Sequence, residues 1–155
     1  MSELKPQRRG RRVSMTPGER DAFLTQAHTC RVGTTDAGGN AHVSALWFVW
    51  DGTALWLNSV VKSQRWTNLA RNPRVSVLVD DGEEYGELRG VELIGEVEVV
   101  GEVPRIGKPR PVLEAPERMF AAKYADGTFS YDGGHAWLRL VPDKIVSWDF
   151  RKITR

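Results

Sequence analysis

The chain has 155 residues, 41% of them hydrophobic and 27% charged, which suits one folded domain and argues against general disorder. Its formal net charge of +2 is too small to indicate a nucleic-acid partner. The single cysteine, Cys30, excludes an intramolecular disulfide, and no cluster of Cys and His has the spacing of a zinc site, so no metal site is expected.

The chain begins with a basic arm, residues 1–14, which we expect to be flexible. Its RRGRR cluster could contact phosphate but is more typical of a solvated terminus. No apolar segment of a secretory signal follows, and the longest apolar run, residues 45–50, is too short to span a bilayer. We therefore expect one domain over residues 15–155, in the cytoplasm and without a membrane partner.

The first half of this domain mixes short helices with strands joined by turns. Thr16 and Glu19 have the spacing of a capping box and predict a helix start. Residues 42–50 alternate between two apolar sets, which predicts a strand buried on both faces. The Asp51-Gly52 pair predicts a tight turn into the next strand. The expected elements are a helix over 17–26, strands over 29–34, 42–50 and 54–60, and a helix over 62–71.

The second half predicts four more strands and one helix. Asn72-Pro73 ends the preceding helix, and Gly90 and Gly95 mark bulges or close backbone approach in a long strand. The proline-rich stretch 102–116 is expected to run over the surface, and a polar loop covers 125–134. The expected elements are strands over 75–79 and 89–100, a helix over 116–124, and strands over 135–141 and 144–150.

Short strands joined by hairpins, with small helices between them, indicate a mainly β protein built as a closed or half-closed antiparallel barrel. No GxGxxG motif follows a strand and no P-loop is present, so the common nucleotide-binding loops are missing. The three histidines, His28, His42 and His135, lie far apart in the sequence, and there is no nucleophile elbow. We interpret each histidine as structural, and no catalytic side chain is expected.

A candidate anion site lies where the strand 54–60 turns into the helix 62–71. Lys62 and Arg65 are three residues apart there, so both side chains can leave one face together with the first free backbone N–H groups. This geometry suits a phosphate, to which Ser59, Ser63 and Asn68 can donate further hydrogen bonds. On spacing alone, a solvated helix face carrying surface charges is the alternative.

Four tryptophans cluster around the same region: Trp47, Trp50, Trp56 and Trp66. Their rings can either fill the barrel core, which is the favoured interpretation, or form the wall of a site for a planar heterocycle. A flat ring would need small or apolar neighbours beside a strand edge, which Val43, Ser44 and Leu46 can provide.

Three segments carry a resemblance to a known family: HVSALWFVWDGTALWLNS, QRWTNLARNPRVSVLVDDG and ELRGVELIGEVEVV. They resemble the core of the pyridoxamine 5'-phosphate oxidase-like, flavin-binding split barrel superfamily, and are most similar to its actinobacterial oxidoreductases that use the deazaflavin coenzyme F420. The resemblance implies a six-stranded antiparallel split β-barrel with Greek-key order, and a homodimer with cofactor sites between the protomers. It separates F420 from FMN poorly, so FMN is the alternative cofactor.

The resemblance also implies which residues hold the cofactor. It places a phosphate at Arg65, where the family more usually has lysine, and no segment matches the C-terminal substrate motif of true pyridoxamine phosphate oxidases. The chain departs from the family in its excursion over 102–134, where the proline-rich stretch 102–116 and the loop 125–134 are longer than a minimal barrel needs and could cap the substrate side. The other implied positions are Lys62 and Ser63 at the cofactor tail, Asn58, Ser59 and Val60 near the phosphate and ribityl chain, Ser44, Leu46 and Trp47 beneath the ring, and Tyr85, Leu88 and Arg89 from the partner chain.

These positions imply an oxidoreductase whose cofactor supplies the chemistry. The expected reaction is hydride transfer from reduced deazaflavin to a conjugated small-molecule acceptor, with solvent or a nearby polar group supplying the proton. One alternative keeps the fold but uses FMN, as a flavin reductase or oxidase. The other alternative is a non-catalytic protein that binds, stores or senses a flavin or deazaflavin.

Overall fold

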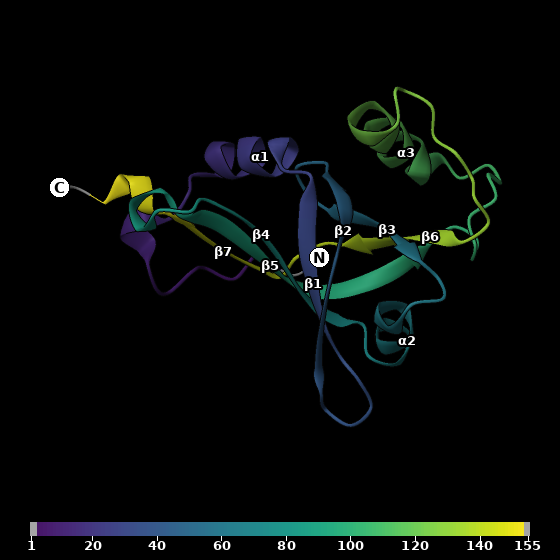
Figure 1. Ribbon diagram of the computed structural model, residues 1–155, viewed down its shortest axis with the longest axis horizontal. Coiled ribbons are helices and arrows are strands. Elements are labelled where there is room, and N and C mark those ends of the chain that lie inside the picture. Colours follow the sequence, from purple (N-terminus) through teal and green to yellow (C-terminus); the bar gives the residue numbers. More distant parts are fainter. Residues whose placement is uncertain (1–2, 154–155) are drawn as a thin grey trace.

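The computed structural model describes residues 3–153, which contain seven strands, three short α-helices and three 3-10 turns (Figure 1). The mainly β class predicted from the sequence is confirmed. In chain order the elements are η1 (Arg11–Val13), α1 (Pro17–Gln26), β1 (Thr29–Thr35), β2 (Ala41–Trp50), β3 (Leu55–Val60), α2 (Gln64–Arg71), β4 (Arg74–Asp81), η2 (Tyr85–Glu87), β5 (Arg89–Val100), α3 (Pro111–Tyr124), β6 (His135–Leu140), β7 (Lys144–Asp149) and η3 (Phe150–Lys152).

Six antiparallel strands close into a barrel in the order β4-β1-β2-β3-β6-β5, because β5 also pairs with β4. The arrangement of β4 beside β1, followed by β2 and β3, is a Greek key. The long strand β5 makes this closure possible, since its first part pairs with β4 and its last part, Val97–Val100, pairs with β6. The six-stranded split barrel predicted from the sequence is therefore confirmed, and β7 adds a seventh strand along β5.

The barrel is split between β2 and β3. These strands pair only over Phe48–Trp50 and Leu55–Leu57. Beyond that point β2 pairs with β1 alone and β3 pairs with β6 alone, so the two strands diverge. The prediction that residues 42–50 are buried on both faces is wrong for the diverging part, where Val43 is 67% and Trp47 50% exposed. The apolar side chains of this part therefore lie at the opening between β2 and β3 and do not fill the barrel core.

Two apolar layers hold the fold together. The barrel interior is filled by side chains such as Val32, Leu57 and Leu93, and α1 adds Phe23 and Leu24 to it. A second layer lies outside the barrel, where α3 covers β2, β3 and β6 (Figure 1). It is formed by Val49, Ala54, Trp56, Val100, Leu113 and Trp137. Trp50 and Trp56 are buried, as the core-packing interpretation predicted, whereas Trp47 is not.

The third helix begins five residues earlier than the sequence predicted. Pro111 occupies its first turn, where a missing N–H costs no hydrogen bond. Pro116, which the sequence analysis placed at the helix start, lies inside the helix and is buried. Proline marks both helix starts and helix breaks, so the pattern alone could not choose between the two positions.

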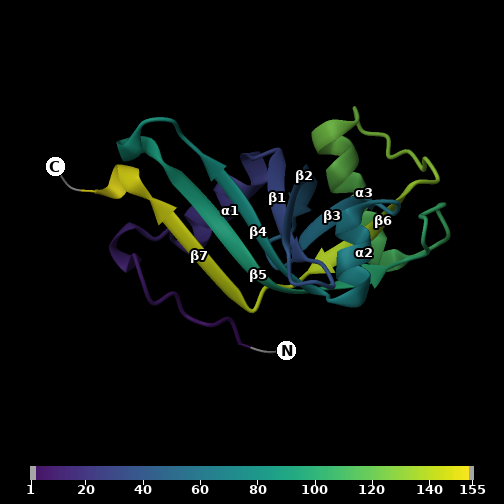
Figure 2. The same cartoon turned by 60° about the horizontal axis from the view of Figure 1, so that its bottom comes forward.

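The N-terminal arm lies along β7 (Figure 2). Lys5 forms a parallel bridge with Lys144, and the Gln7 side chain both donates to the Ser147 carbonyl and accepts from the Ser147 N–H, at 3.0 and 2.9 Å. The predicted domain boundary after residue 14 stays a prediction, and residues 1–2 lie outside the described residues. In residues 3–153, no helix combines the length and the apolar character needed to cross a membrane.

Candidate functional site

A pocket of about 440 Å³ lies over the split between β2 and β3. Its floor is formed by the diverging parts of the two strands and by the guanidinium of Arg65. The C-terminal end of α3 and the loop that leads into β6 form the opposite wall. Five of the residues implied by the resemblance line this pocket, namely Leu46, Trp47, Asn58, Val60 and Arg65.

Arg65 reaches the split from the first turn of α2. Its Nε donates to Ser59 Oγ at 3.0 Å and its Nη1 donates to Ser44 Oγ at 2.6 Å, so the fork is held between β3 and β2. The residue is only 6% exposed, and burial lowers the pKa of its guanidinium. None of the ion pairs within residues 3–153 includes Arg65.

An arginine stays charged at any ordinary pH, and a buried charge without a counter-ion is costly. The hydroxyls of Ser59 and Ser44 accept two of the hydrogen bonds that Arg65 can donate, but they are neutral and do not balance its positive charge. The floor of the pocket is therefore suited to an anionic ligand, which supports the phosphate interpretation of Arg65 over the alternative of a solvated surface charge.

Trp47 forms a rigid aromatic wall of the pocket. Its ring stacks on Tyr124, with centroids 4.5 Å apart and planes 3° from parallel, and Phe120 lies 6.1 Å away. Tyr124 is fixed in turn, because its hydroxyl lies 2.7 Å from the Phe48 carbonyl and 2.6 Å from the His28 carbonyl. Burial raises the pKa of this phenol. A half-exposed indole held in this way offers one open face to a planar ring.

The diverging strand edges add backbone groups to the pocket. In an antiparallel pair, alternate residues direct their N–H and C=O groups to the neighbouring strand, and the residues between them direct these groups away. Along residues 43–47 the neighbour is β1 alone, so every second residue directs its backbone groups toward the split. Such groups can bind the polar edge of a heterocycle.

Three other residues predicted for the site, Lys62, Ser63 and Asn68, lie near the pocket but do not line it. Ser63 caps α2, since its Oγ accepts from the Trp66 N–H at 3.1 Å, while Lys62 is exposed in the adjoining turn. Asn68 does not fit its expected role as a phosphate donor. It is buried, donates to Thr34 Oγ1 at 3.0 Å and accepts from Gln64 Nε2 at 2.7 Å, so its amide joins α2 to β1 and does not line the pocket.

Tyr85, Leu88 and Arg89 lie at the opposite end of the molecule, beside η3 (Figure 1). Tyr85 is 71% exposed and its ring centroid lies 5.1 Å from that of Phe150. Within one chain these three residues do not reach the pocket over the split. Their expected role depends on a second copy of the chain.

The sequence analysis missed several residues that line the pocket: Phe120, Phe129, Ser130, Asp132 and His135. His135 was interpreted as structural, but it begins β6 directly opposite Val60, and its Nδ1 lies 2.5 Å from Asp132 Oδ2. A signal was present in the sequence, since the segment DGGH begins with an aspartate and ends with a histidine at the start of a predicted strand.

A buried carboxylate anchors the segments that form the far wall. Glu117 of α3 accepts from Arg105 Nε at 2.7 Å, Trp137 Nε1 at 3.0 Å and Tyr131 Oη at 2.9 Å. Arg105 also donates to Glu102 at 2.7 Å, and hydrogen bonds from the loop outweigh burial and lower the pKa of Glu102 to about 2. The stretch 102–116 was expected to run over the surface, yet Arg105 within it is buried.

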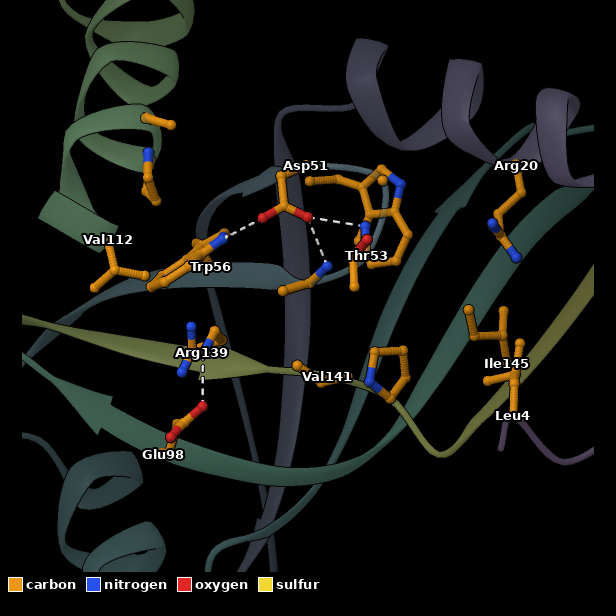
Figure 3. Close-up of a pocket in the computed structure, with 16 residues that line it drawn as sticks. Leu4, Arg20, Asp51, Thr53, Trp56, Glu98, Val112, Arg139, Val141 and Ile145 are labelled. Carbon is orange, nitrogen blue, oxygen red and sulfur yellow. Dashed lines mark hydrogen bonds and ion pairs between the residues drawn. The ribbon is translucent and has the colours of Figure 1, made fainter. Parts of the chain in front are cut away.

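A larger cavity, of about 820 Å³, lies at the other end of α3 (Figure 3). Polar groups around it are paired within the chain. Trp56 Nε1 donates to Asp51 at 2.9 Å and Arg139 donates to Glu98 at 2.5 Å, as the dashed lines show. No buried charge in this cavity lacks a partner in the way that Arg65 does. The pocket over the split is therefore the stronger candidate site.

An antiparallel barrel in which β2 and β3 diverge, with the buried guanidinium of Arg65 where they do so, is a split barrel. Residues 16–149 match the family model of pyridoxamine 5'-phosphate oxidase, and the chain belongs to this family. The resemblance noted from the sequence is confirmed. No protein among the curated ones matches the chain.

Solved structures share the fold. A conserved hypothetical protein, Rv2991 from Mycobacterium tuberculosis, is 29% identical with a TM-score of 0.77, over 96% of this chain and 92% of that one. An F420 reductase is 23% identical with a TM-score of 0.60, over 81% and 94%. An FAD-binding protein from Mesorhizobium loti is 18% identical with a TM-score of 0.65, over 86% and 93%. The heme storage protein HutZ from Vibrio cholerae, 16% identical with a TM-score of 0.68 over 84% and 93%, shows that the fold also serves another ligand.

Proposed function

We propose that the chain is an oxidoreductase that binds coenzyme F420 over the split and transfers a hydride between reduced deazaflavin and a conjugated small-molecule acceptor. The observation that carries this proposal is the buried guanidinium of Arg65, which has no carboxylate partner within residues 3–153 and lies on the floor of a pocket with an aromatic wall. Membership of the family and the likeness to an F420 reductase and an FAD-binding protein support the class of cofactor.

The residues present fit such a cofactor. Arg65, with Lys62 in the exposed turn beside it, would hold an anionic tail, and Trp47 would lie against the ring. Backbone groups of the diverging strands would bind the polar edge of the ring. The cofactor would supply hydride-transfer chemistry, and the chain's own contribution is to orient the reactants and exclude water.

FMN is the alternative cofactor, because its phosphate would satisfy Arg65 as well as the tail of F420 would. Purification from a host that makes both cofactors, followed by the absorption spectrum of the bound chromophore, distinguishes the two. A deazaflavin spectrum is expected, and an FMN spectrum would overturn the choice of cofactor. In a second assay, reduced deazaflavin should be oxidised faster with a conjugated acceptor than without one. If no acceptor in a broad panel raises the rate, the non-catalytic binding alternative is favoured.

We also propose a homodimer in which Tyr85, Leu88 and Arg89 of one copy approach the pocket of the other. Around the pocket, Val43, Trp47 and Val60 are exposed by 67, 50 and 40%, an apolar rim that a second copy could cover.

The dimer proposal predicts that Val43→Asp dissociates the protein and weakens cofactor binding, because a charge would be buried at the contact. Light scattering and cofactor titration measure the two effects. Val103→Asp is the matched control, since Val103 is also an exposed valine but lies in the excursion. A Val43→Asp protein that stays dimeric would contradict the proposed interface.

A further inference from the structure

The pocket over the split has a second polar wall, whose residues are not among those proposed to hold the cofactor. It is formed by Asp132 and His135, at the point where the loop 125–134 enters β6. Asp132 Oδ2 lies 2.5 Å from His135 Nδ1. Among the described residues that line the pocket, Arg65, Asp132 and His135 are the ionisable ones.

Both residues are held in place by the backbone around them. The Gly134 N–H donates to Asp132 Oδ1 at 2.8 Å, and the Gly134 carbonyl accepts from the Val61 N–H at 2.9 Å, which ties the loop to the end of β3. The hydrogen bond from Gly134, together with the nearby imidazole, lowers the pKa of Asp132. Asp132 is therefore a fixed carboxylate beside the histidine.

One side of the imidazole faces the carboxylate and the other faces the pocket. Nδ1 is buried, yet 34% of the His135 side chain is exposed. The exposed part is thus the opposite side of the ring, which carries Nε2, and His135 lines the pocket. A carboxylate beside Nδ1 orients the ring and leaves Nε2 free to exchange a proton with a molecule in the pocket.

The charges divide the pocket into two parts. Arg65 attracts an anionic tail toward the strands, whereas the Asp132 carboxylate disfavours an anion beside the loop. Phe120 and Phe129 lie on the same side as the loop and offer apolar contact. A neutral, conjugated acceptor suits this side, within reach of His135.

We propose that His135, positioned by Asp132, is the proton donor to the acceptor, an inference that rests on the proposed function. One carbon of the acceptor's double bond forms a bond to the hydride supplied by reduced deazaflavin, and the electron pair of the double bond moves toward the electron-withdrawing group. The Nε2–H bond of the imidazolium breaks, and its proton bonds to the other carbon. The acceptor is reduced by two electrons, the deazaflavin is oxidised, and the neutral imidazole regains a proton from water.

The test uses His135→Gln in the full chain, with Glu114→Gln as a control whose side chain is exposed on α3 and does not line the pocket. Cofactor affinity should be unchanged in both variants. Acceptor-dependent turnover should fall by about 100-fold or more in His135→Gln alone, the usual effect of losing a general acid.

Two further measurements separate this inference from the function on which it rests. In Asp132→Asn, kcat should fall while KM for the acceptor stays constant, as expected for a positioning residue. In the wild type, the imidazole NMR signals of His135 should shift when an acceptor analogue binds to the protein loaded with oxidised cofactor. Unchanged turnover in His135→Gln with cofactor bound would overturn the proton-donor role alone. Failure of the wild type to bind any deazaflavin or flavin would overturn the proposed function as well.

Discussion

Replacing Arg65 with methionine is expected to weaken cofactor binding by a factor of about 5 to 150, which corresponds to about 1 to 3 kcal/mol for a lost charge-assisted hydrogen bond. The stability of the cofactor-free protein should fall little or rise, because the substitution removes a buried charge that has no carboxylate partner within residues 3–153. Titration of the cofactor and urea unfolding of the cofactor-free protein measure the two effects.

Arg71→Met is the matched control, since Arg71 lies on the same helix but is exposed and donates to the Thr35 carbonyl. Cofactor affinity should be unchanged in that variant. If Arg65→Met binds the cofactor normally but unfolds at lower urea concentration, Arg65 is a structural residue and the anion site lies elsewhere. Lys62→Ala should also weaken cofactor binding, because Lys62 adds a mobile positive charge beside the anionic tail of the cofactor.

Replacing Glu117 with glutamine should lower the free energy of unfolding by about 3 to 5 kcal/mol, the usual cost of breaking a buried ion pair. Arg105, which is more buried than Glu117, would then lose one of its two carboxylate partners. The hydrogen bonds from Trp137 and Tyr131 would also meet an amide in place of a carboxylate. Urea unfolding followed by tryptophan fluorescence measures the loss.

Glu114→Gln is the control for this experiment, because Glu114 is exposed on the same helix. Its effect on stability should be small. A loss below about 1 kcal/mol in Glu117→Gln, within the range of an exposed ion pair, would contradict the view that this network anchors the excursion. Hydrogen exchange should in addition become faster in the loop 125–134, which the Tyr131 hydroxyl ties to Glu117.

The parts of the fold that could be predicted from the sequence are those set by local pattern. Thr16 caps α1 through a capping box, as its spacing with Glu19 indicated. The strands and their antiparallel order followed from alternation and turn residues. The position of Arg65 beside Ser59 could also be expected, because a short turn joins β3 to α2.

What could not be predicted depends on contacts between distant segments. Trp47 is apolar by type, but its exposure follows from the divergence of β2 from β3, which no local pattern contains. Asn68 was expected to face a phosphate, yet Thr34, from a strand far back in the chain, uses its amide. Asp132 and His135 are only three residues apart in the sequence, but only the fold places them over the split.

The covering of β7 by the N-terminal arm has a consequence for solubility. An exposed edge strand can pair with the same strand of another molecule and so seed aggregation. Here the Gln7 side-chain amide bonds Ser147 as a backbone peptide group would, and the Lys5 N–H donates to the Asp143 carbonyl at 2.8 Å. The arm thereby occupies hydrogen-bonding positions that a neighbouring molecule would need, and its basic cluster adds repulsion between copies.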